Sequence, residues 1–117
     1  MAAIENRVFF VFGGVAGAFG VALSAAAAHT GGAHMATVAN FLLFHAPALL
    51  ALSLVPRGTL LTLGGWVLIA GLLFFNGDLL ARDLLGDRLF PFAAPLGGTA
   101  VILGWIVVAI SGLTSRK

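Results

Sequence analysis

Residues 8–28 read VFFVFGGVAGAFGVALSAAAA and contain no charged side chain. A hydrocarbon core about 30 Å thick takes roughly 20 helical residues to cross, so this run is long enough to span a membrane. It is also longer than the roughly 7 to 15 apolar residues of a secretory signal peptide. We therefore expect it to be a retained transmembrane helix.

Three further apolar stretches follow, at about residues 37–55, 59–80 and 95–113. Of the 117 residues, 61% are hydrophobic and 9% are charged, whereas about a quarter of the residues in a soluble domain are charged. A chain of this length has little left over for an extramembrane domain. The sequence predicts a single all-α domain over residues 1–117, an integral membrane bundle of four transmembrane helices.

The basic residues predict the orientation of this bundle. With four spans, both termini and the connection at Arg57 lie on one side, and the connection at Arg82 and Arg88 lies on the other. The cytoplasmic side of a membrane protein carries the excess of Lys and Arg. We expect a multi-pass protein of the inner (cytoplasmic) membrane with both termini in the cytoplasm. The basic residues on that side are Arg7, Arg57, Arg116 and Lys117.

Several classes of partner and chemistry are excluded by composition. The pI of about 10.6 comes from six basic against four acidic residues, with no basic cluster for nucleic acid. The chain has no cysteine, no H-x-x-x-H spacing and no Gly-x-Ser-x-Gly turn. Haem held by two histidines needs them at equal depth, whereas His29 ends its stretch and His45 lies inside the next. We expect no cofactor, no metal site, no catalytic residues and no enzyme activity.

Small residues recur at helical spacing, which is typical of close helix packing in lipid. Gly64, Gly71 and Asp78 lie seven apart, which places them on nearly the same helix face, so Asp78 is expected to point into the bundle. The residues expected to pack between helices are Gly13, Gly17, Gly20, Ser24, Gly64, Gly71, Pro95, Gly97, Gly98, Gly104 and Trp105.

Asp78 is the most informative polar residue, because an ionisable group inside a membrane costs roughly 2.5 to 3.5 kcal/mol on insertion scales. Arg82 follows one turn later, and His45 enters from the same outer side. We expect a polar pocket in the outer leaflet with an apolar aromatic lining. The predicted ligand-binding residues are His29, His45, Asp78, Arg82, Phe41, Phe44, Phe74 and Phe75. The alternative is that Asp78 and Arg82 pair locally and close the span at headgroup level.

The fourth stretch carries a proline, any residue, two glycines and then a Gly-Trp pair, seen as Pro95 to Gly98 and Gly104-Trp105. With His45 in the second stretch, this pattern resembles the family called domain of unknown function 423, over nearly the whole chain. The resemblance implies small four-span membrane proteins and implies no activity.

The chain departs from that family at two places. Residues 24–29 read SAAAAH, where the family usually has Gly-Ala-Phe-Gly-Ala-His. Residues 75–80 read FNGDLL, where the family pattern is Phe-Ser-Gly-Ser-Leu-Tyr. A role for Asp78 therefore cannot be taken from the resemblance.

Three functions stay open. The first is a non-enzymatic accessory subunit, or a bundle that binds a lipid or quinone-like molecule, within a homo-oligomer or larger membrane complex. The second is an oligomeric proton-coupled transporter or channel with His45 and Asp78 as the proton relay. The third is a purely structural membrane protein.

Overall fold

The computed structural model describes residues 4–30, 33–55 and 58–114. It forms four helices, α1 (Ile4–Thr30), α2 (Met35–Leu54), α3 (Thr59–Leu85) and α4 (Ala93–Thr114). All four are long and apolar enough to cross a membrane. Even α2, with 20 residues, is about 30 Å long at the helical rise. The prediction of an all-α protein with four helices of membrane-spanning length is confirmed.

The helices extend beyond the apolar stretches that predicted them. The first turn of α1 includes Glu5, and α3 continues past Arg82 to Leu85. Gly86 ends α3 with a φ of 83°, a left-handed conformation that glycine adopts without a steric penalty. Pro95 lies in the first turn of α4, where its missing N–H needs no helical partner.

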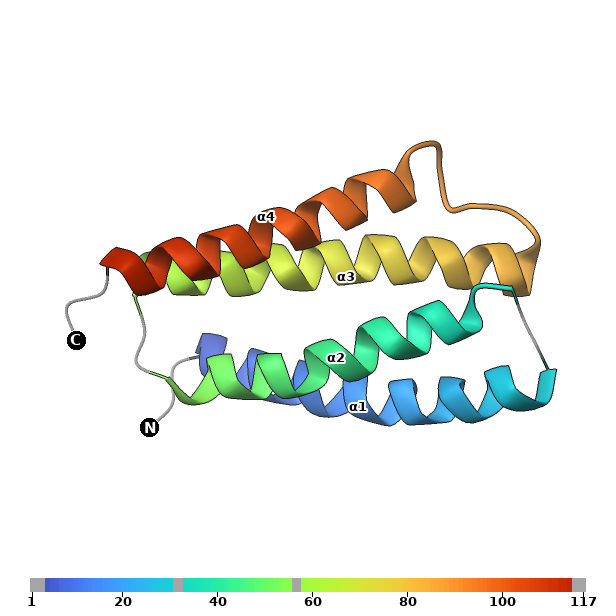
Figure 1. Cartoon of the computed structure of the whole chain (residues 1–117), viewed down its shortest axis with the longest axis horizontal. Coiled ribbons are helices and arrows are strands. Elements are labelled where there is room, and N and C mark those ends of the chain that lie inside the picture. The colour runs from blue at the N-terminus through green and yellow to red at the C-terminus, as the bar shows by residue number, and fades with distance from the viewer. Residues whose placement is uncertain (1–3, 31–32, 56–57, 115–117) are drawn as a thin grey trace.

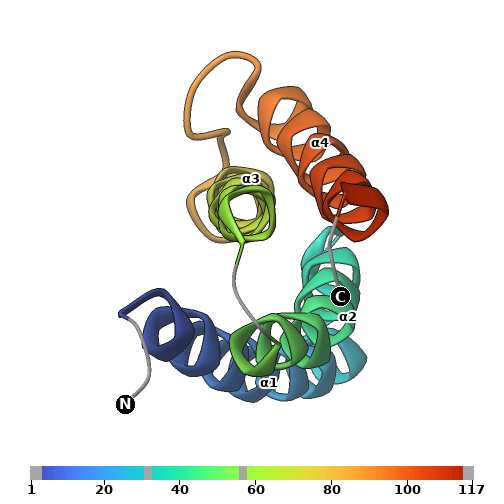
Figure 2. The same ribbon diagram turned by 90° about the vertical axis from the view of Figure 1, so that its left-hand side faces the viewer.

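The helices form two antiparallel hairpins, α1 with α2 and α3 with α4 (Figure 1). Seen end on, the hairpins lie against each other as two layers (Figure 2). The bundle measures 47 × 27 × 21 Å, and α1 begins at the same end at which α4 finishes. Three basic residues of the orientation argument, Arg57, Arg116 and Lys117, lie outside the described residues.

Glycines let the helices of each hairpin approach closely. In the first hairpin, a Cβ on Gly20 would lie 2.7 Å from the Leu43 side chain of α2. In the second, a Cβ on Gly71 would lie 2.7 Å from the backbone nitrogen of Val101 in α4. Both distances are too short for a methyl group, so the absence of a Cβ at Gly20 and Gly71 allows the helices to approach this closely.

The other small residues expected between helices divide into two groups. In the first group, a Cβ added to the glycine would either be too close to the facing helix or lie in ordinary contact with it. This group consists of Gly13, Gly17, Gly64, Gly97, Gly98 and Gly104. Ser24 is exposed, so the small-residue contact of α1 does not extend to it, contrary to expectation. Pro95 is also exposed and acts at the helix start rather than between helices.

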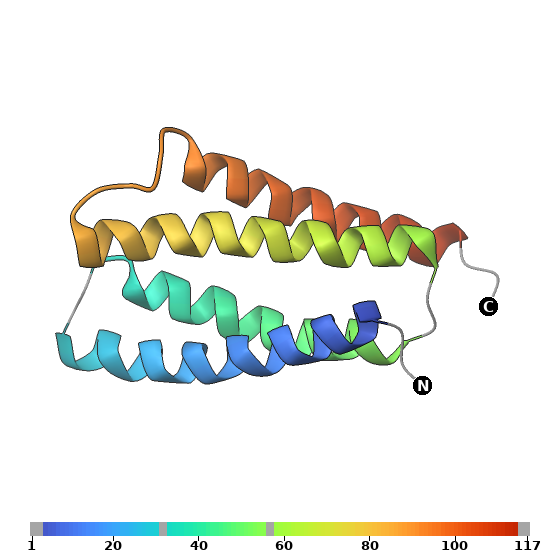
Figure 3. The ribbon, with the colours of Figure 1, turned by 180° about the vertical axis from the view of Figure 1, so that it is seen from behind.

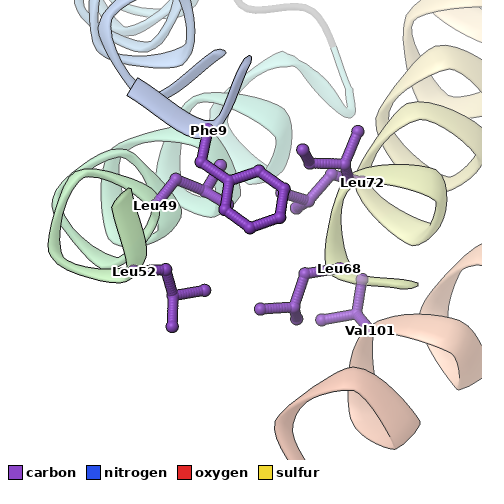
Figure 4. Packing of buried hydrophobic residues seen from close by; sticks show 7 residues of the cluster. Phe9, Leu49, Leu52, Leu68, Leu72 and Val101 are labelled. Carbon is purple, nitrogen blue, oxygen red and sulfur yellow. The ribbon is translucent and has the colours of Figure 1, made fainter. Parts of the chain in front are cut away.

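The apolar core joins the two hairpins through Phe9. Its ring is fully buried, points from α1 between Leu49 of α2 and Leu72 of α3 (Figure 4), and meets Trp66 edge to face at 5.2 Å. Gly65 of α3 leaves the space that this ring occupies. The core cluster consists of Phe9, Leu49, Leu52, Leu68, Ile69, Leu72 and Val101.

Candidate functional site

His45 links α2 to α4. The indole Nε1–H of Trp105 donates a hydrogen bond to His45 Nε2 at 3.0 Å, and His45 Nδ1 lies 2.7 Å from the carbonyl oxygen of Phe41. The indole N–H is a donor only, so Nε2 must accept. Nδ1 then carries the ring proton and donates it to Phe41. His45 is therefore a neutral imidazole with both nitrogens bonded.

Aromatic rings surround this histidine. Phe41 stacks on His45 with ring centroids 5.9 Å apart and on Phe75 of α3 at 4.5 Å. Phe74 packs instead against Phe90, at 5.9 Å. Phe44 is exposed and takes no part in the cluster. Of the four phenylalanines predicted to line the pocket, Phe41 stacks on His45, and Phe75 joins the cluster through Phe41.

Asp78 forms a second cluster on α3. Its side chain is 0% exposed, and Oδ2 accepts a hydrogen bond from Arg82 Nε at 3.0 Å. Oδ1 accepts the backbone N–H of Leu89 at 2.8 Å. One buried carboxylate thus pairs with the next turn of its own helix and holds the connection between α3 and α4.

Asp83 connects the end of α3 to the start of α2. Its carboxylate accepts the backbone N–H of His34 at 2.8 Å and lies 2.9 Å from His34 Nδ1. His34 is the N-cap of α2 and makes no side-chain cap of its own. Asp83 therefore caps α2 from another helix, where a carboxylate also suits the positive end of the helix dipole.

The structure does not bring the predicted polar residues into one pocket. His45 bonds to Trp105 and Phe41, whereas Asp78 bonds to Arg82 and Leu89. His29 is exposed at the end of α1. No direct hydrogen bond joins His45 to Asp78 in the described chain, and each side chain is bonded to a different element.

A crevice of about 270 Å³ lies between α1 and α3, with α2 beside it. Figure 3, the view from behind, shows α1 and α3 on the viewer's side of the bundle. Ala16 and Leu72 belong to its buried wall, whereas Val15 and Leu73 stand at its exposed rim. The residues that line it are Phe12, Val15, Ala16, Phe19, Leu23, Leu42, Leu72, Leu73, Asn76, Gly77 and Leu80.

Asn76 is the polar side chain of this crevice. It is 5% exposed, and neither Nδ2 nor Oδ1 has a hydrogen-bond partner among the described residues. The sequence favoured a helix-end or surface position for Asn76 over a ligand-binding role. Its burial could have been predicted from the sequence, since Gly65, Leu72 and Leu79 share the buried face of α3 with Asn76 at helical spacing. An unbonded amide on an otherwise apolar buried face requires an explanation, such as a bound molecule.

A further hollow, of about 320 Å³, lies at the opposite end of the bundle, beside Arg7 and Ser53. There the Asn6 amide donates to the Ser53 carbonyl oxygen at 2.7 Å, which joins α1 to α2. Arg7 itself is exposed. Within the described ranges, no three His, Asp or Glu side chains gather closely enough to hold a metal ion.

The family model described as "Protein of unknown function (DUF423)" matches residues 14–98. The chain is similar to a UPF0382 membrane protein of Haemophilus influenzae, with 30% identity over 88% of this chain and 91% of that protein. It is 25% identical to the UPF0382 inner membrane protein YgdD of Escherichia coli, over 97% of this chain and 95% of YgdD.

A UPF0382 membrane protein of Staphylococcus epidermidis is 32% identical over 63% of this chain. The chain spans 62% of the length of that relative. No solved structure matches the chain.

Proposed function

This chain belongs to the DUF423 family of small membrane proteins, and we propose that it is a non-enzymatic binding protein of the inner membrane that holds a lipid or quinone-like molecule between α1 and α3. The membrane location is supported by the printed description of the relative YgdD as an inner membrane protein. The observation that carries the proposal is the buried, unpartnered amide of Asn76 in an apolar crevice.

The energetics favour a ligand at this amide. A buried polar group without a hydrogen bond costs about 1 to 3 kcal/mol, and leucine in its place would avoid that cost. The rim residue Val15 is 48% exposed, so the crevice opens sideways to the surroundings of the helices, which in a membrane are lipid chains. A molecule dissolved in the bilayer can therefore enter and offset the cost by bonding to Asn76.

A transport function with His45 and Asp78 as a proton relay has less support. His45 has both ring nitrogens bonded, and Asp78 is bonded to Arg82 and Leu89. A relay between them needs a hydrogen-bonded path that these contacts do not provide. The prediction that this chain assembles into a homo-oligomer or a larger membrane complex is not tested by the contacts within one chain.

Photolabelling in lipid nanodiscs tests the binding proposal. The probes are a 16-carbon alcohol and its methyl ether, each with a diazirine in the chain. We expect saturable labelling of crevice residues in α1 and α3. Val15→Trp places bulk at the rim and should reduce it. Val11→Trp, an exposed position of α1 outside this crevice, should not. The proposal is contradicted if the probes label all lipid-facing surfaces uniformly and to the same extent in Val15→Trp and Val11→Trp.

The proposal includes an orientation with both termini in the cytoplasm. It is supported by the shared end at which α1 begins and α4 finishes, and by Arg82 and Arg88 lying towards the opposite end (Figure 1). The chain has no cysteine, so single cysteines report one position each. In intact spheroplasts, Asp87→Cys should react with an impermeant maleimide, whereas Glu5→Cys and Thr114→Cys should react only after permeabilisation. The reverse pattern, or opposite sides for Glu5 and Thr114, refutes this orientation.

A further inference from the structure

We infer that the crevice between α1 and α3 selects an uncharged lipid with a hydroxyl group, an inference that rests on the proposed binding function and names the chemical class of its ligand. The selecting group is the side-chain amide of Asn76, a lining residue whose two polar atoms are buried and unbonded among the described residues, in an otherwise apolar lining.

Both halves of this amide need a partner. Nδ2 offers two N–H donors and Oδ1 is an acceptor, and neither is bonded within the described chain. A ligand with acceptors only, such as a quinone, an ether or an ester, can satisfy Nδ2 and leaves Oδ1 unsatisfied. A hydroxyl group both donates and accepts. It is therefore the smallest neutral group that can bond to both atoms of Asn76.

The lack of ionisable side chains in the described crevice lining restricts the ligand to an uncharged molecule. The lining residues that the structure describes carry no ionisable side chain. The nearby ionisable residues of α3 are engaged elsewhere, since Asp78 pairs with Arg82 and Asp83 with His34. A phosphate or ionised carboxylate in the crevice would lose its hydration without gaining a cation, at a large cost in free energy. The crevice thus disfavours anionic headgroups.

The volume and the open rim of the crevice fit a slender ligand. A volume of about 270 Å³ is close to the lower end of the roughly 300 to 1,000 Å³ typical of ligand pockets. It admits the polar end and the first part of an alkyl chain. The exposed rim at Val15 and Leu73 lets the rest of the chain continue into the bilayer.

The two photolabelling probes differ only in whether the terminal oxygen carries a proton, so their ratio reports this selection. In the wild-type chain, crevice labelling by the alcohol should exceed that by the ether about three- to tenfold, the equivalent of one net hydrogen bond. Asn76→Leu should bring the ratio to about one and still bind both probes. Asn76→Ser keeps a donor and an acceptor and should retain part of the preference.

Asn40→Leu is the matched control, because Asn40 is an exposed amide on α2 outside the crevice. It should leave the ratio unchanged. A short-chain quinone should compete for the alcohol site more weakly than an unlabelled alcohol of equal length.

The failures are distinguishable. Absence of saturable crevice labelling by either probe, with Val15→Trp equal to wild type, refutes the binding function itself. Saturable labelling without a preference for the alcohol, or a preference that survives in Asn76→Leu, overturns the hydroxyl inference and leaves binding intact. Stronger competition by the quinone than by the alcohol also overturns it.

Discussion

Trp105 of α4 donates its indole N–H to His45 of α2, and this side-chain hydrogen bond crosses between the two hairpins. The neighbouring Gly104 makes the approach of α4 possible, because a Cβ there would lie 2.9 Å from the Leu68 side chain of α3. The Gly-Trp pair and the histidine of the second helix therefore act together. Glycine brings α4 close to α3, and tryptophan extends from α4 to α2.

Removal of the indole N–H should weaken the contact between the hairpins. Trp105→Phe keeps an aromatic ring and loses the bond to His45, so the free energy of unfolding should fall by about 0.5 to 1.5 kcal/mol. Reversible unfolding in mixed detergent micelles measures this change. Trp66→Phe is a matched control, since Trp66 is 40% exposed against 41% for Trp105 and contacts Phe9 through its ring.

In the background of His45→Leu, the additional cost of Trp105→Phe should be smaller than in the wild-type chain. Equal losses for Trp105→Phe and Trp66→Phe, or full additivity with His45→Leu, would mean that the bond makes no net contribution.

Neutralising Asp78 should loosen the connection between α3 and α4. Asp78→Asn loses the charge-assisted bond to Arg82 and weakens the acceptor for the Leu89 N–H, so stability should fall by about 1 to 3 kcal/mol. Hydrogen exchange at the Leu89 amide should become faster than in the wild type. Asp87→Asn, at an exposed carboxylate that accepts only the local Arg88 N–H in the described chain, is the control. If both variants exchange alike at Leu89, Asp78 does not hold this connection.

The faces of the helices could be predicted from the sequence, and the partners of the polar side chains only in part. Spacing by seven placed Asp78 on the buried face with Gly64 and Gly71, since helical periodicity is a local property. The bond between Asp78 and Arg82 is also local, one turn apart. The bond to Leu89 depends on the conformation of the chain after α3, where Phe92 has a φ of 70°, and no periodic pattern encodes that.

The bond of His45 to Trp105 could not be predicted from the sequence, for a related reason. The sequence places His45 and Asp78 towards the same outer side, but depth along a helix does not determine which neighbouring helix a side chain faces. That depends on the rotation of α2 against α4, set by side-chain packing such as the Phe41 stack on Phe75. A helix-end or surface position was expected for Asn76 because the polar residues from 76 to 83 resemble the end of a span, whereas α3 continues to Leu85.

The capping of α2 by Asp83 predicts an order of effects. Asp83→Ala removes the acceptor for both the His34 backbone N–H and its ring, whereas His34→Ala removes only the ring. Asp83→Ala should therefore lower stability about twice as much as His34→Ala, because two hydrogen bonds are lost rather than one. Unfolding of both variants under one condition tests the order. A larger loss in His34→Ala would show that the ring, and not the cap, carries the contact.

Two glycines, Gly71 of α3 and Gly14 of α1, predict opposite signs for the same substitution. A Cβ at Gly71 would lie 2.7 Å from the Val101 backbone nitrogen, which cannot move without shifting α4, so Gly71→Ala should cost about 1 to 3 kcal/mol. Gly14 has no atom within 4 Å of the corresponding position, and alanine there reduces the entropy of the unfolded chain. Gly14→Ala should therefore stabilise by roughly 0.5 to 1 kcal/mol.

Both variants add one methyl group to a helix of the same protein, so helix propensity acts equally and the difference isolates the contact between α3 and α4. Unfolding free energies in the same micelles should differ by about 1.5 to 4 kcal/mol, from the sum of the two effects. If Gly71→Ala proves as stable as Gly14→Ala, the α3 and α4 backbones are farther apart than in this structure, and close glycine packing does not hold the second hairpin together.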